Sequence, residues 1–501
     1  MASTARPRVD RVRLIAHSVL SAVSSRDAYA NLLLASALRD AGLHGKDAAL
    51  ATELVYGTLR NRGCYDAIIS LCADRRIDQI DPPVLDALRL GAHQLLGLRI
   101  KSHAAVATTV DLVIEAAGRR PSGFANAVLR RIAPRDLESW IEIVAPDRAE
   151  DLTGHLSVRY SHPRWIVTAF ADALGEKLTG SASGSAAGET EAVLAADAGR
   201  PIVHLTVAPG LSASDELVAS GAGAARWSPF GAYLRHGDPG EIEAVAAGRA
   251  WVQDEASQLA AYALAKVGPP GDGQHWLDLC AGPGGKARLL AGLAAQQDAR
   301  LLAAELHPHR AELVSAAFNK LGAALADRSV DPDSVSNASV EPGRDDGPAR
   351  AHGRESVARV VVADGVAPAW QAGIFDRVLA DVPCSGLGSL RRRPEARWRR
   401  RPDDIAALAG LQRGLLTSAL DDARPGGVVA YVTCSPHLAE TRQVVADVLA
   451  ARSGIEVLDA PAVLDDVPDL RCPEPYSRYA QFWPHRHGTD AIFIALLRLS
   501  R

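Results

Sequence analysis

The chain has 501 residues, of which 48% are apolar and 23% are charged, and its formal net charge at pH 7 is −4. A chain of this length is too long to fold around one hydrophobic core, so we expect about two to four domains. The composition is typical of a globular protein in solution, and the small negative charge excludes a surface that attracts nucleic acid everywhere. Any nucleic-acid partner must therefore meet a local basic patch.

The six cysteines are isolated in the sequence and form no Cys-x-x-Cys pair. This spacing predicts neither a disulfide framework nor a structural zinc site, so we expect no bound metal. Isolated thiols are typical of the reducing cytosol, and we expect a cytoplasmic protein. No stretch approaches the roughly 18 uninterrupted apolar residues of a membrane-spanning helix, so we expect no membrane partner.

Residues 1–145 predict an all-helical domain, because apolar residues recur at helical spacing from residue 12 onward. A pair of prolines at 82 and 83 predicts the start of one of these helices. Arg130 and Arg131 lie at another helix end, beside Arg119 and Arg120. Positive charge is favourable at a helix C-terminus, so Arg130 and Arg131 form either a solvated helix end or an RNA-binding patch.

Residues 146–250 predict a linker followed by a small α+β subdomain. The segment 180–189 is rich in glycine, serine and alanine, which is typical of a flexible loop. Alternating apolar residues at 202–207 predict a strand, and a helix from residue 212 and a strand near 232–235 follow it.

From residue 251 to 501, strand-like and helix-like segments alternate, which predicts a doubly wound parallel sheet with helices on both faces. The insertion 326–356 has almost no large apolar residues, and we expect a disordered surface loop without a catalytic part. The predicted strands are 275–279, 300–304, 359–363, 375–380, 428–433 and 491–496.

Four successive strands of this predicted sheet are each followed by an acid or by a glycine-rich turn. The first strand runs into a glycine-rich turn, which matches neither the P-loop nor the dinucleotide-binding pattern but lets a ligand approach the backbone closely. Glu305, Asp364 and Asp381 follow the next three strands. Because ligands bind at the carboxyl ends of parallel strands, this series predicts one ligand groove.

Two of the strand ends also deliver a cysteine into a loop, Cys384 in Asp-Val-Pro-Cys-Ser-Gly at 381–386 and Cys434 in Tyr-Val-Thr-Cys-Ser-Pro at 431–436. A single buried cysteine more commonly acts as a small apolar side chain. The pairing of two such loops favours a functional role, and the pattern alone does not say which cysteine reacts.

Together these segments resemble the RNA (cytosine-C5) methyltransferase family. The resemblance rests on Asp-Leu-Cys-Ala-Gly-Pro-Gly-Gly-Lys at 278–286, on both cysteine loops, and on the closing segment 483–494. The helical region is similar to the NusB-type RNA-binding domain of the 16S rRNA branch of this family. The chain departs from the family at Gly282, usually alanine, at Ala287, usually threonine, and in the insertion 326–356. Glycine at 282 should loosen its loop.

The resemblance implies an all-α NusB-like domain, an α+β RNA-binding subdomain and a Rossmann-like, S-adenosylmethionine-dependent methyltransferase domain. It implies that Cys434 attacks carbon 6 of cytosine, that Cys384 assists release, and that Asp381 lies between donor and base. Lys286 either neutralises local charge or caps its turn. The implied cofactor-binding residues are Cys280, Ala281, Gly282, Pro283, Gly284, Gly285, Lys286, Glu305, Asp364 and Asp381.

Seven arginines and one tryptophan lie between residues 391 and 401, directly after the Cys384 loop. An arginine run is commonly a solvated face, but the adjacent loop favours contact with RNA phosphates and unstacked bases. The target base has to leave its stack before a thiol can reach carbon 6. The predicted RNA contacts in this run are Arg391, Arg392, Arg393, Arg397 and Trp398.

The resulting hypothesis is a monomeric enzyme that methylates a cytosine of 16S rRNA through a covalent cysteine adduct. The nearest alternative keeps the chemistry and takes tRNA as the substrate. A non-catalytic RNA-binding or antitermination factor is a further alternative, but such a protein has no use for two cysteines at strand ends. DNA cytosine methylation is disfavoured because enzymes of that class resemble the chain less.

Overall fold

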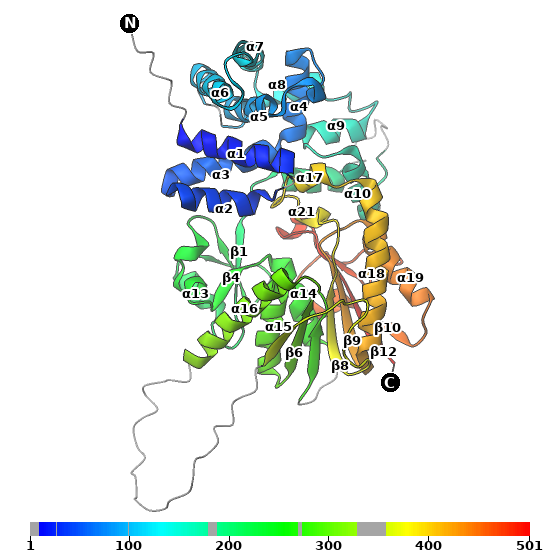
Figure 1. Cartoon of the computed structure of the whole chain (residues 1–501). Helices are drawn as coiled ribbons and strands as arrows, with labels where there is room; N and C mark the ends of the chain where they lie inside the picture. Colours follow the sequence, from blue (N-terminus) through cyan, green and yellow to red (C-terminus); the bar gives the residue numbers. More distant parts are fainter. Residues whose placement is uncertain are drawn as a thin grey trace, which may run out of the picture. The chain divides into compact units, whose positions relative to one another are not determined.

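The computed structural model describes residues 10–26, 28–98, 100–178, 188–268, 273–327 and 357–500 (Figure 1). Contacts divide the chain into a helical unit, Met1–Pro201 with Ser389–Asp404, and a sheet unit, Ile202–Gly388 with Ile405–Arg501. This division falls inside the middle segment 146–250 of the sequence-based scheme. The predicted flexible loop, up to residue 187, and the predicted insertion, from residue 328, lie outside the described residues.

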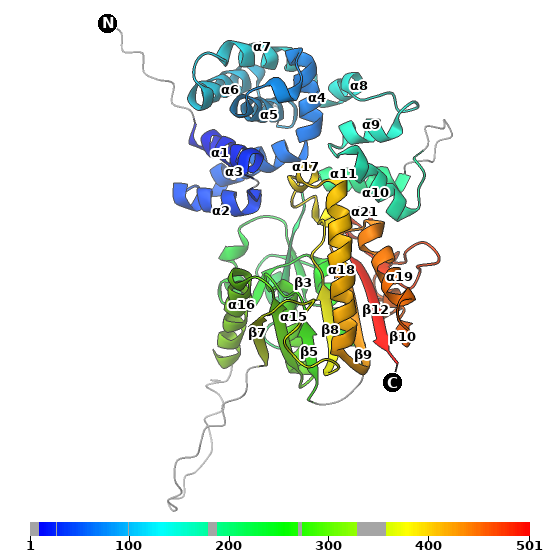
Figure 2. The ribbon, with the colours of Figure 1, turned by 45° about the vertical axis from the view of Figure 1, so that its right-hand side comes forward.

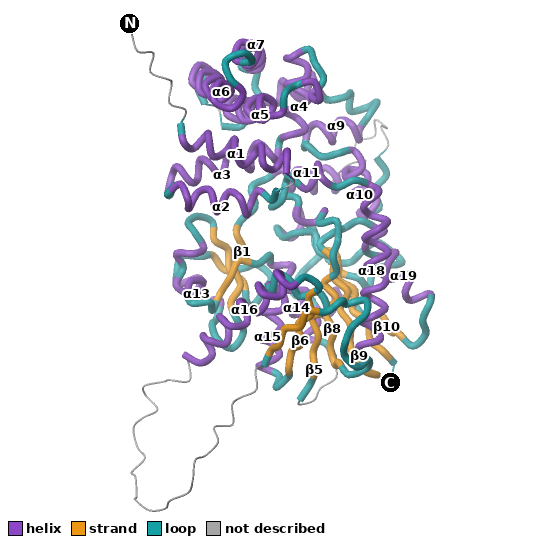
Figure 3. Tube along the Cα trace, in the orientation of Figure 1, coloured by secondary structure: helices purple, strands orange, loops and turns teal. Residues whose placement is uncertain are grey.

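The helical unit is built from helices, and those between Arg11 and Val144 enclose an apolar core, which confirms the predicted all-α fold (Figures 1 and 3). α5 begins at Pro82, as predicted, because the first residue of a helix needs no amide partner. None of the helices in the described ranges is long and apolar enough to cross a membrane. The helices are α1 (Arg11–Arg26), α2 (Ala30–Ala41), α3 (Gly45–Arg60), α4 (Arg62–Ala73), η1 (Ile77–Gln79), α5 (Pro82–Leu96), α6 (Ser102–Ala117), α7 (Ser122–Ile132), α8 (Leu137–Val144), α9 (Leu152–Arg159), α10 (Arg164–Leu174), α11 (Gly188–Ala198) and α17 (Ala396–Arg399).

The sheet unit begins with a small antiparallel sheet in the order β2-β3-β1-β4, which agrees with the predicted α+β subdomain. Leu205, Leu217 and Ala232 are fully buried in its core. Its elements are β1 (Val203–Val207), α12 (Ser214–Ala219), β2 (Gly223–Ala224), β3 (Gly231–Leu234), η2 (Pro239–Glu241), α13 (Glu243–Ala246) and β4 (Ala250–Val252).

The second sheet has the order β10-β12-β9-β8-β5-β6-β7, with β11 paired to β12. Strands β5 to β9 are parallel, whereas β12 is antiparallel to β9, so the expectation of a wholly parallel sheet is wrong at this edge. β10 runs in the same direction as β9. After β10 the chain reverses, and β12 lies between β10 and β9, antiparallel to both. The elements are α14 (Glu255–Lys266), β5 (His275–Asp278), α15 (Gly285–Gln296), β6 (Arg300–Glu305), α16 (Pro308–Asp327), β7 (Ala358–Val362), β8 (Phe375–Asp381), η4 (Leu387–Ser389), α18 (Pro402–Asp422), β9 (Ala423–Thr433), η5 (Leu438–Glu440), α19 (Arg442–Ala450), β10 (Ile455–Val457), α20 (Ala460–Val463), β11 (Ala480–Gln481), α21 (Pro484–His487) and β12 (Phe493–Leu499).

Helices cover both faces of this sheet, and Figure 2 shows α18 running along one of them. The buried side chains of β9 alternate between the faces, as expected for a strand. Val428, Ala430 and Val432 pack in the cluster that includes α14 and α15. Val429 and Tyr431 pack in the cluster that includes α18 and α19. This arrangement is the predicted Rossmann-like α/β fold, and it brings the carboxyl ends of β5, β8 and β9 to one edge.

Candidate active site

The glycine-rich turn between β5 and α15 is held by hydrogen bonds to the next strand end. Gly284 adopts a left-handed φ of 108° just before the helix begins. The Gly282 amide donates a 3.1 Å hydrogen bond to Glu305, and Arg310 donates to the Gly282 carbonyl. A Cβ atom on Gly282 would lie 2.1 Å from Glu305 Oε2. Glycine at 282 therefore leaves room for Glu305 and for bonds that fix the loop, contrary to the predicted loosening.

The strand-end acids Glu305 and Asp364 have different surroundings. Glu305 is 4% exposed and also accepts a 3.0 Å hydrogen bond from the His307 amide. Asp364 is exposed, and its carboxylate accepts a 2.9 Å bond from the Val366 amide. The two acids thus end neighbouring parallel strands, one as a buried acceptor and one as an exposed acceptor.

Asp278, at the end of β5, is a buried acid without a predicted role. Burial raises its pKa to about 8, and the nearby charge of Asp381 contributes to the rise. Its Oδ1 lies 3.4 Å from the Cys280 amide, and its Oδ2 is buried with no hydrogen-bond partner among the described residues. Asp278 is therefore mostly neutral at pH 7, despite lying beside charged groups.

Lys286 and Asp381 form an ion pair with 2.8 Å between Nζ and Oδ2. Burial acts to lower the pKa of the Lys286 ammonium, but the charge of Asp381, the hydrogen bond to it and the charge of Cys434 together raise it. Lys286 is thus a stable cation between an acid and a cysteine. This geometry favours the charge-neutralising role over the capping role for Lys286.

The two loop cysteines meet because β8 and β9 are adjacent and parallel, with Asp381 opposite Val432. Their Sγ atoms lie 3.0 Å apart, and the Gly388 amide donates a 2.8 Å bond to the Cys434 carbonyl. The hydrogen bond shared with Cys434, together with burial, raises the pKa of Cys384 well above its ordinary value. Burial, with the charge of Asp278, does the same to Cys280. Cys384 and Cys280 are therefore protonated thiols at neutral pH.

A buried carboxylate without a predicted role, Glu440, contacts both cysteine loops. It is fully buried at the end of η5 and accepts hydrogen bonds from Ser385, Ser435 and Gln412. An acid six residues after Cys434 is visible in the sequence, but nothing in the local pattern shows that it turns inward.

The arginine run departs from its predicted role at Arg397. The run belongs to the helical unit, where Arg397 is fully buried and donates to the carbonyls of Arg60, Ser161 and Asp197. The prediction of an RNA contact is therefore wrong for Arg397, because its guanidinium is used inside the protein. Trp398 is packed against Gly63, where an added Cβ would lie 2.5 Å from its ring.

The remaining predicted RNA-binding residues lie at different depths. Arg391 is only 7% exposed and Arg392 is half-buried, whereas Arg393 is exposed. Arg130 and Arg131 are exposed at the end of α7, and Arg131 donates a 2.7 Å bond to the Cys72 carbonyl.

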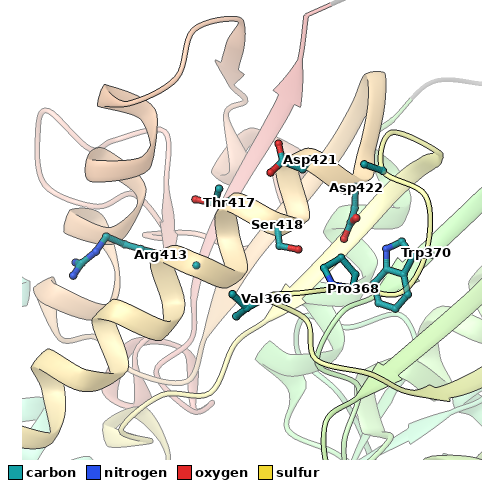
Figure 4. Close-up of a pocket in the computed structure, with 10 residues that line it drawn as sticks. Val366, Pro368, Trp370, Arg413, Thr417, Ser418, Asp421 and Asp422 are labelled. Carbon is teal, nitrogen blue, oxygen red and sulfur yellow. The ribbon is translucent and has the colours of Figure 1, made fainter.

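Two cavities have no cysteine among their lining residues. One, of about 500 Å³ in the helical unit, is lined by α6 and α7 and includes Arg130. The other, of about 520 Å³ in the sheet unit, lies between the loop that precedes β8 and the second half of α18 (Figure 4). Trp370 and Asp422 line it, and burial raises the pKa of Asp422 to about 6. Neither cavity contains a predicted cofactor-binding or catalytic residue.

Comparison with known proteins gives two family matches. Residues 265–341 and 350–498 match the model of the 16S rRNA methyltransferase RsmB/F family, and residues 10–134 match the NusB family. A Mycobacterium tuberculosis protein described as a methyltransferase, Rv1407, is 49% identical over 98% of this chain and 97% of its own length. The ribosomal RNA small subunit methyltransferase B of Pseudomonas syringae is 30% identical over 97% of this chain and 96% of its own length.

Among solved structures, the crystal structure of PH0851 has the same fold. It covers 98% of this chain and 100% of its own, with a TM-score of 0.72 and 21% sequence identity. The family match and the full-length relatives agree with the resemblance seen in the sequence. The chain therefore belongs to the 16S rRNA methyltransferase RsmB/F family, whose members are S-adenosylmethionine-dependent RNA methyltransferases.

Proposed function

We propose that the protein methylates carbon 5 of a cytosine in 16S rRNA, through a covalent bond between Cys434 and carbon 6. The observation that carries this proposal is the thiol pair, 3.0 Å apart, beside the Lys286–Asp381 ion pair. Carbon 5 of cytosine is a weak nucleophile until a thiolate adds to carbon 6 and turns the ring into an enamine. Such a reaction needs one sulfur that attacks and one group that later removes a proton.

The residues around the glycine-rich turn fit S-adenosylmethionine. Within the described ranges no side chain caps the start of α15, so its first amides suit a carboxylate ligand. Glu305 ends β6 as a buried acceptor, the place at which sheets of this kind bind ribose hydroxyls. When bound, this cofactor supplies an electrophilic methyl group. The residues assigned to it are Cys280, Ala281, Gly282, Pro283, Gly284, Gly285, Lys286, Glu305, Asp364 and Asp381.

The charges around the two thiols support Cys434 as the attacking group. We assign the shared proton of the thiol pair to Cys384, whose pKa is raised, so that Cys384 donates to Cys434, whose sulfur is also influenced by the Lys286 cation. Thiolates form beside cations and hydrogen-bond donors. The Cys434 sulfur then bonds to carbon 6, and the electrons of the carbon 5–carbon 6 double bond form a carbon 4–carbon 5 double bond with negative charge on N3, which makes carbon 5 nucleophilic. We assign to Asp381 and Lys286 the hydrogen bonds to the cytosine edge that balance this charge.

We assign the removal of the carbon 5 proton, which releases the product, to Cys384. Once the Cys434 sulfur is bonded to carbon, it no longer carries the charge and hydrogen bond that hold the proton on Cys384. Cys384 can then lose its proton to water and take the proton from carbon 5. The electrons of that bond restore the ring double bond, and the bond between Cys434 and carbon 6 breaks. One proton is released per methyl group transferred.

The relatives and the local charge support 16S rRNA as the substrate. The Pseudomonas syringae relative is named for the small-subunit ribosomal RNA, which favours 16S rRNA over tRNA. We assign RNA contacts to Arg130 and Arg131 at the end of α7 and to the exposed Arg393, since exposed arginines pair with phosphates. We further propose that the protein acts as a monomer in the cytoplasm.

Methyl transfer with purified protein tests this proposal. Wild-type protein, labelled S-adenosylmethionine and 16S rRNA should give 5-methylcytosine at a defined position, mapped by bisulfite sequencing. Cys434→Ala should abolish transfer and leave cofactor binding unchanged, whereas Cys472→Ala, a buried thiol outside the site, should remain active. Methylation of tRNA alone, of another base, or by Cys434→Ala at the wild-type rate would contradict the proposal.

A further inference from the structure

Glu440 holds its carboxylate in a fixed position with donors from three segments of the sheet unit. Oε1 accepts from the Ser385 amide at 2.7 Å and from Gln412 Nε2 at 3.1 Å. Oε2 accepts from the Ser435 hydroxyl at 2.6 Å and from the Ser385 hydroxyl. The side chain is fully buried, so these bonds have no competition from water.

The donors belong to the loops that carry the two cysteines. Ser385 follows Cys384 directly, and Ser435 follows Cys434 directly. The two serine hydroxyls also lie 3.1 Å from each other. One carboxylate therefore fixes the residue after each thiol, and with it the separation of the two sulfur atoms.

The position of Glu440 itself is fixed from the protein core. The buried Tyr431 hydroxyl, on β9, donates a 2.7 Å bond to the Glu440 carbonyl. Gln412, on α18, donates both to the Glu440 carboxylate and, at 2.9 Å, to the Pro383 carbonyl next to Cys384. The network thus connects the Cys384 loop to the end of β9 and to a helix, all within the sheet unit.

We propose that Glu440 is the positioning residue that sets the distance between Cys384 and Cys434, an inference that rests on the proposed two-cysteine chemistry. The attacked carbon 6 and the deprotonated carbon 5 are adjacent atoms of one ring, so both sulfurs must reach neighbouring atoms of the same base. Glu440 acts through Ser385 and Ser435 and needs no contact with RNA or cofactor.

The variant Glu440→Gln removes the negative charge of the side chain but keeps its ability to form hydrogen bonds. Its carbonyl can accept from the Ser385 amide and from Gln412, and its amide can donate to the serine hydroxyls, which also accept. Glu440→Gln should therefore keep both loops in place, whereas Glu440→Ala leaves four donors without their acceptor. A misplacement of about 1 Å in a reacting group can lower a rate by about 100-fold.

Steady-state kinetics on full-length protein give the first readout. We expect Glu440→Ala to lower kcat by about 100-fold while KM for RNA changes by less than about threefold, because the substrate-binding groups remain. Glu440→Gln should recover at least about tenfold of this loss. Glu456→Ala, an exposed acid of the same unit, serves as the control. If Glu440→Ala does not fold, Ser385→Ala and Ser435→Ala each remove one side-chain donor and should each lower kcat by about tenfold.

Binding of phenylarsine oxide gives a second readout that needs no methyl transfer. The arsenic atom forms bonds to two sulfurs and one water is released, so it binds tightly only when two thiols can reach it. We expect tight binding by wild type and Glu440→Gln, and weak binding by Glu440→Ala and by Cys384→Ala.

Normal kcat and tight arsenical binding in Glu440→Ala would overturn the inference. The inference would also be overturned if Glu440→Gln were as inactive as Glu440→Ala but bound the arsenical tightly. The carboxylate charge would then take part in the chemistry. If wild type methylates no RNA cytosine, the proposed function fails, and the arsenical comparison still tests the spacing of the thiols.

Discussion

Arg397→Met would replace a fully buried cation by an apolar side chain of similar length. In the native protein the guanidinium donates to three carbonyls, at 2.9 Å to Arg60, 3.2 Å to Ser161 and 2.7 Å to Asp197. Burial lowers its pKa to about 10, so it remains charged at neutral pH. A hydrogen bond to a charged group contributes about 1.5–3 kcal/mol, which gives about 4.5–9 kcal/mol for three. Methionine recovers the desolvation cost of the cation, several kcal/mol.

We therefore expect Arg397→Met to destabilise the helical unit by about 2–4 kcal/mol, the difference between these two effects. Because a chain of two units need not unfold in one step, hydrogen exchange resolved by peptide is the suitable assay. Protection should fall around residues 57–62 and 156–162, which carry two of the carbonyls. The salt dependence of RNA binding should stay that of wild type.

Arg393→Met, an exposed arginine of the same run, is the matched control and should leave exchange unchanged. The reasoning would be refuted if Arg397→Met exchanged like wild type and flattened the salt dependence of RNA binding. That result would mean that Arg397 contacts RNA, as the sequence predicts.

Three further experiments test other parts of the site. The raised pKa of Asp278 means that its ionisation opposes folding, so the stability of wild type should fall as pH rises from about 4 to about 8. Asp278→Asn lacks this acid and should therefore become more stable than wild type over that range, which urea unfolding at several pH values measures. Lys286→Met should lower methyl transfer by about 100-fold or more, because the ion pair with Asp381 is lost, and an unchanged rate would remove Lys286 from the chemistry. Arg130→Ala with Arg131→Ala should reduce the slope of log K against log salt for RNA by about 1–2, and an unchanged slope would make them a solvated helix end.

The features that could be predicted from the sequence are those encoded locally. Alternation in β9 and the glycine-rich turn before α15 depend on neighbouring residues, so their patterns indicate strand and turn directly. The meeting of the two cysteine loops follows from parallel strands that end at one edge. The antiparallel direction of β12 could not be read, because an isolated apolar strand has the same pattern in either direction.

The features that the sequence did not reveal depend on distant partners. The arginine run looks like a solvated basic face. Arg397 nevertheless donates a hydrogen bond to the carbonyl of Arg60 on α3, which is 337 positions away in the sequence. Glu440 looks like an ordinary acid at a helix start, and only its donors in the Cys384 loop and in α18 show its purpose. The raised pKa of Asp278 results from burial, which depends on packing across the sheet.

The most direct test of the central claim is to trap the covalent complex and locate the modified residue. Cys384→Ala protein, incubated with S-adenosylmethionine and 16S rRNA, should accumulate an adduct that survives denaturation, because the step that removes the carbon 5 proton is lost. After nuclease and protease digestion, mass spectrometry should find a methylated cytidine on the peptide that contains Cys434, and Cys384→Ala with Cys434→Ala should give none. An adduct on another residue, or no adduct while the wild-type protein methylates the RNA, would contradict the account.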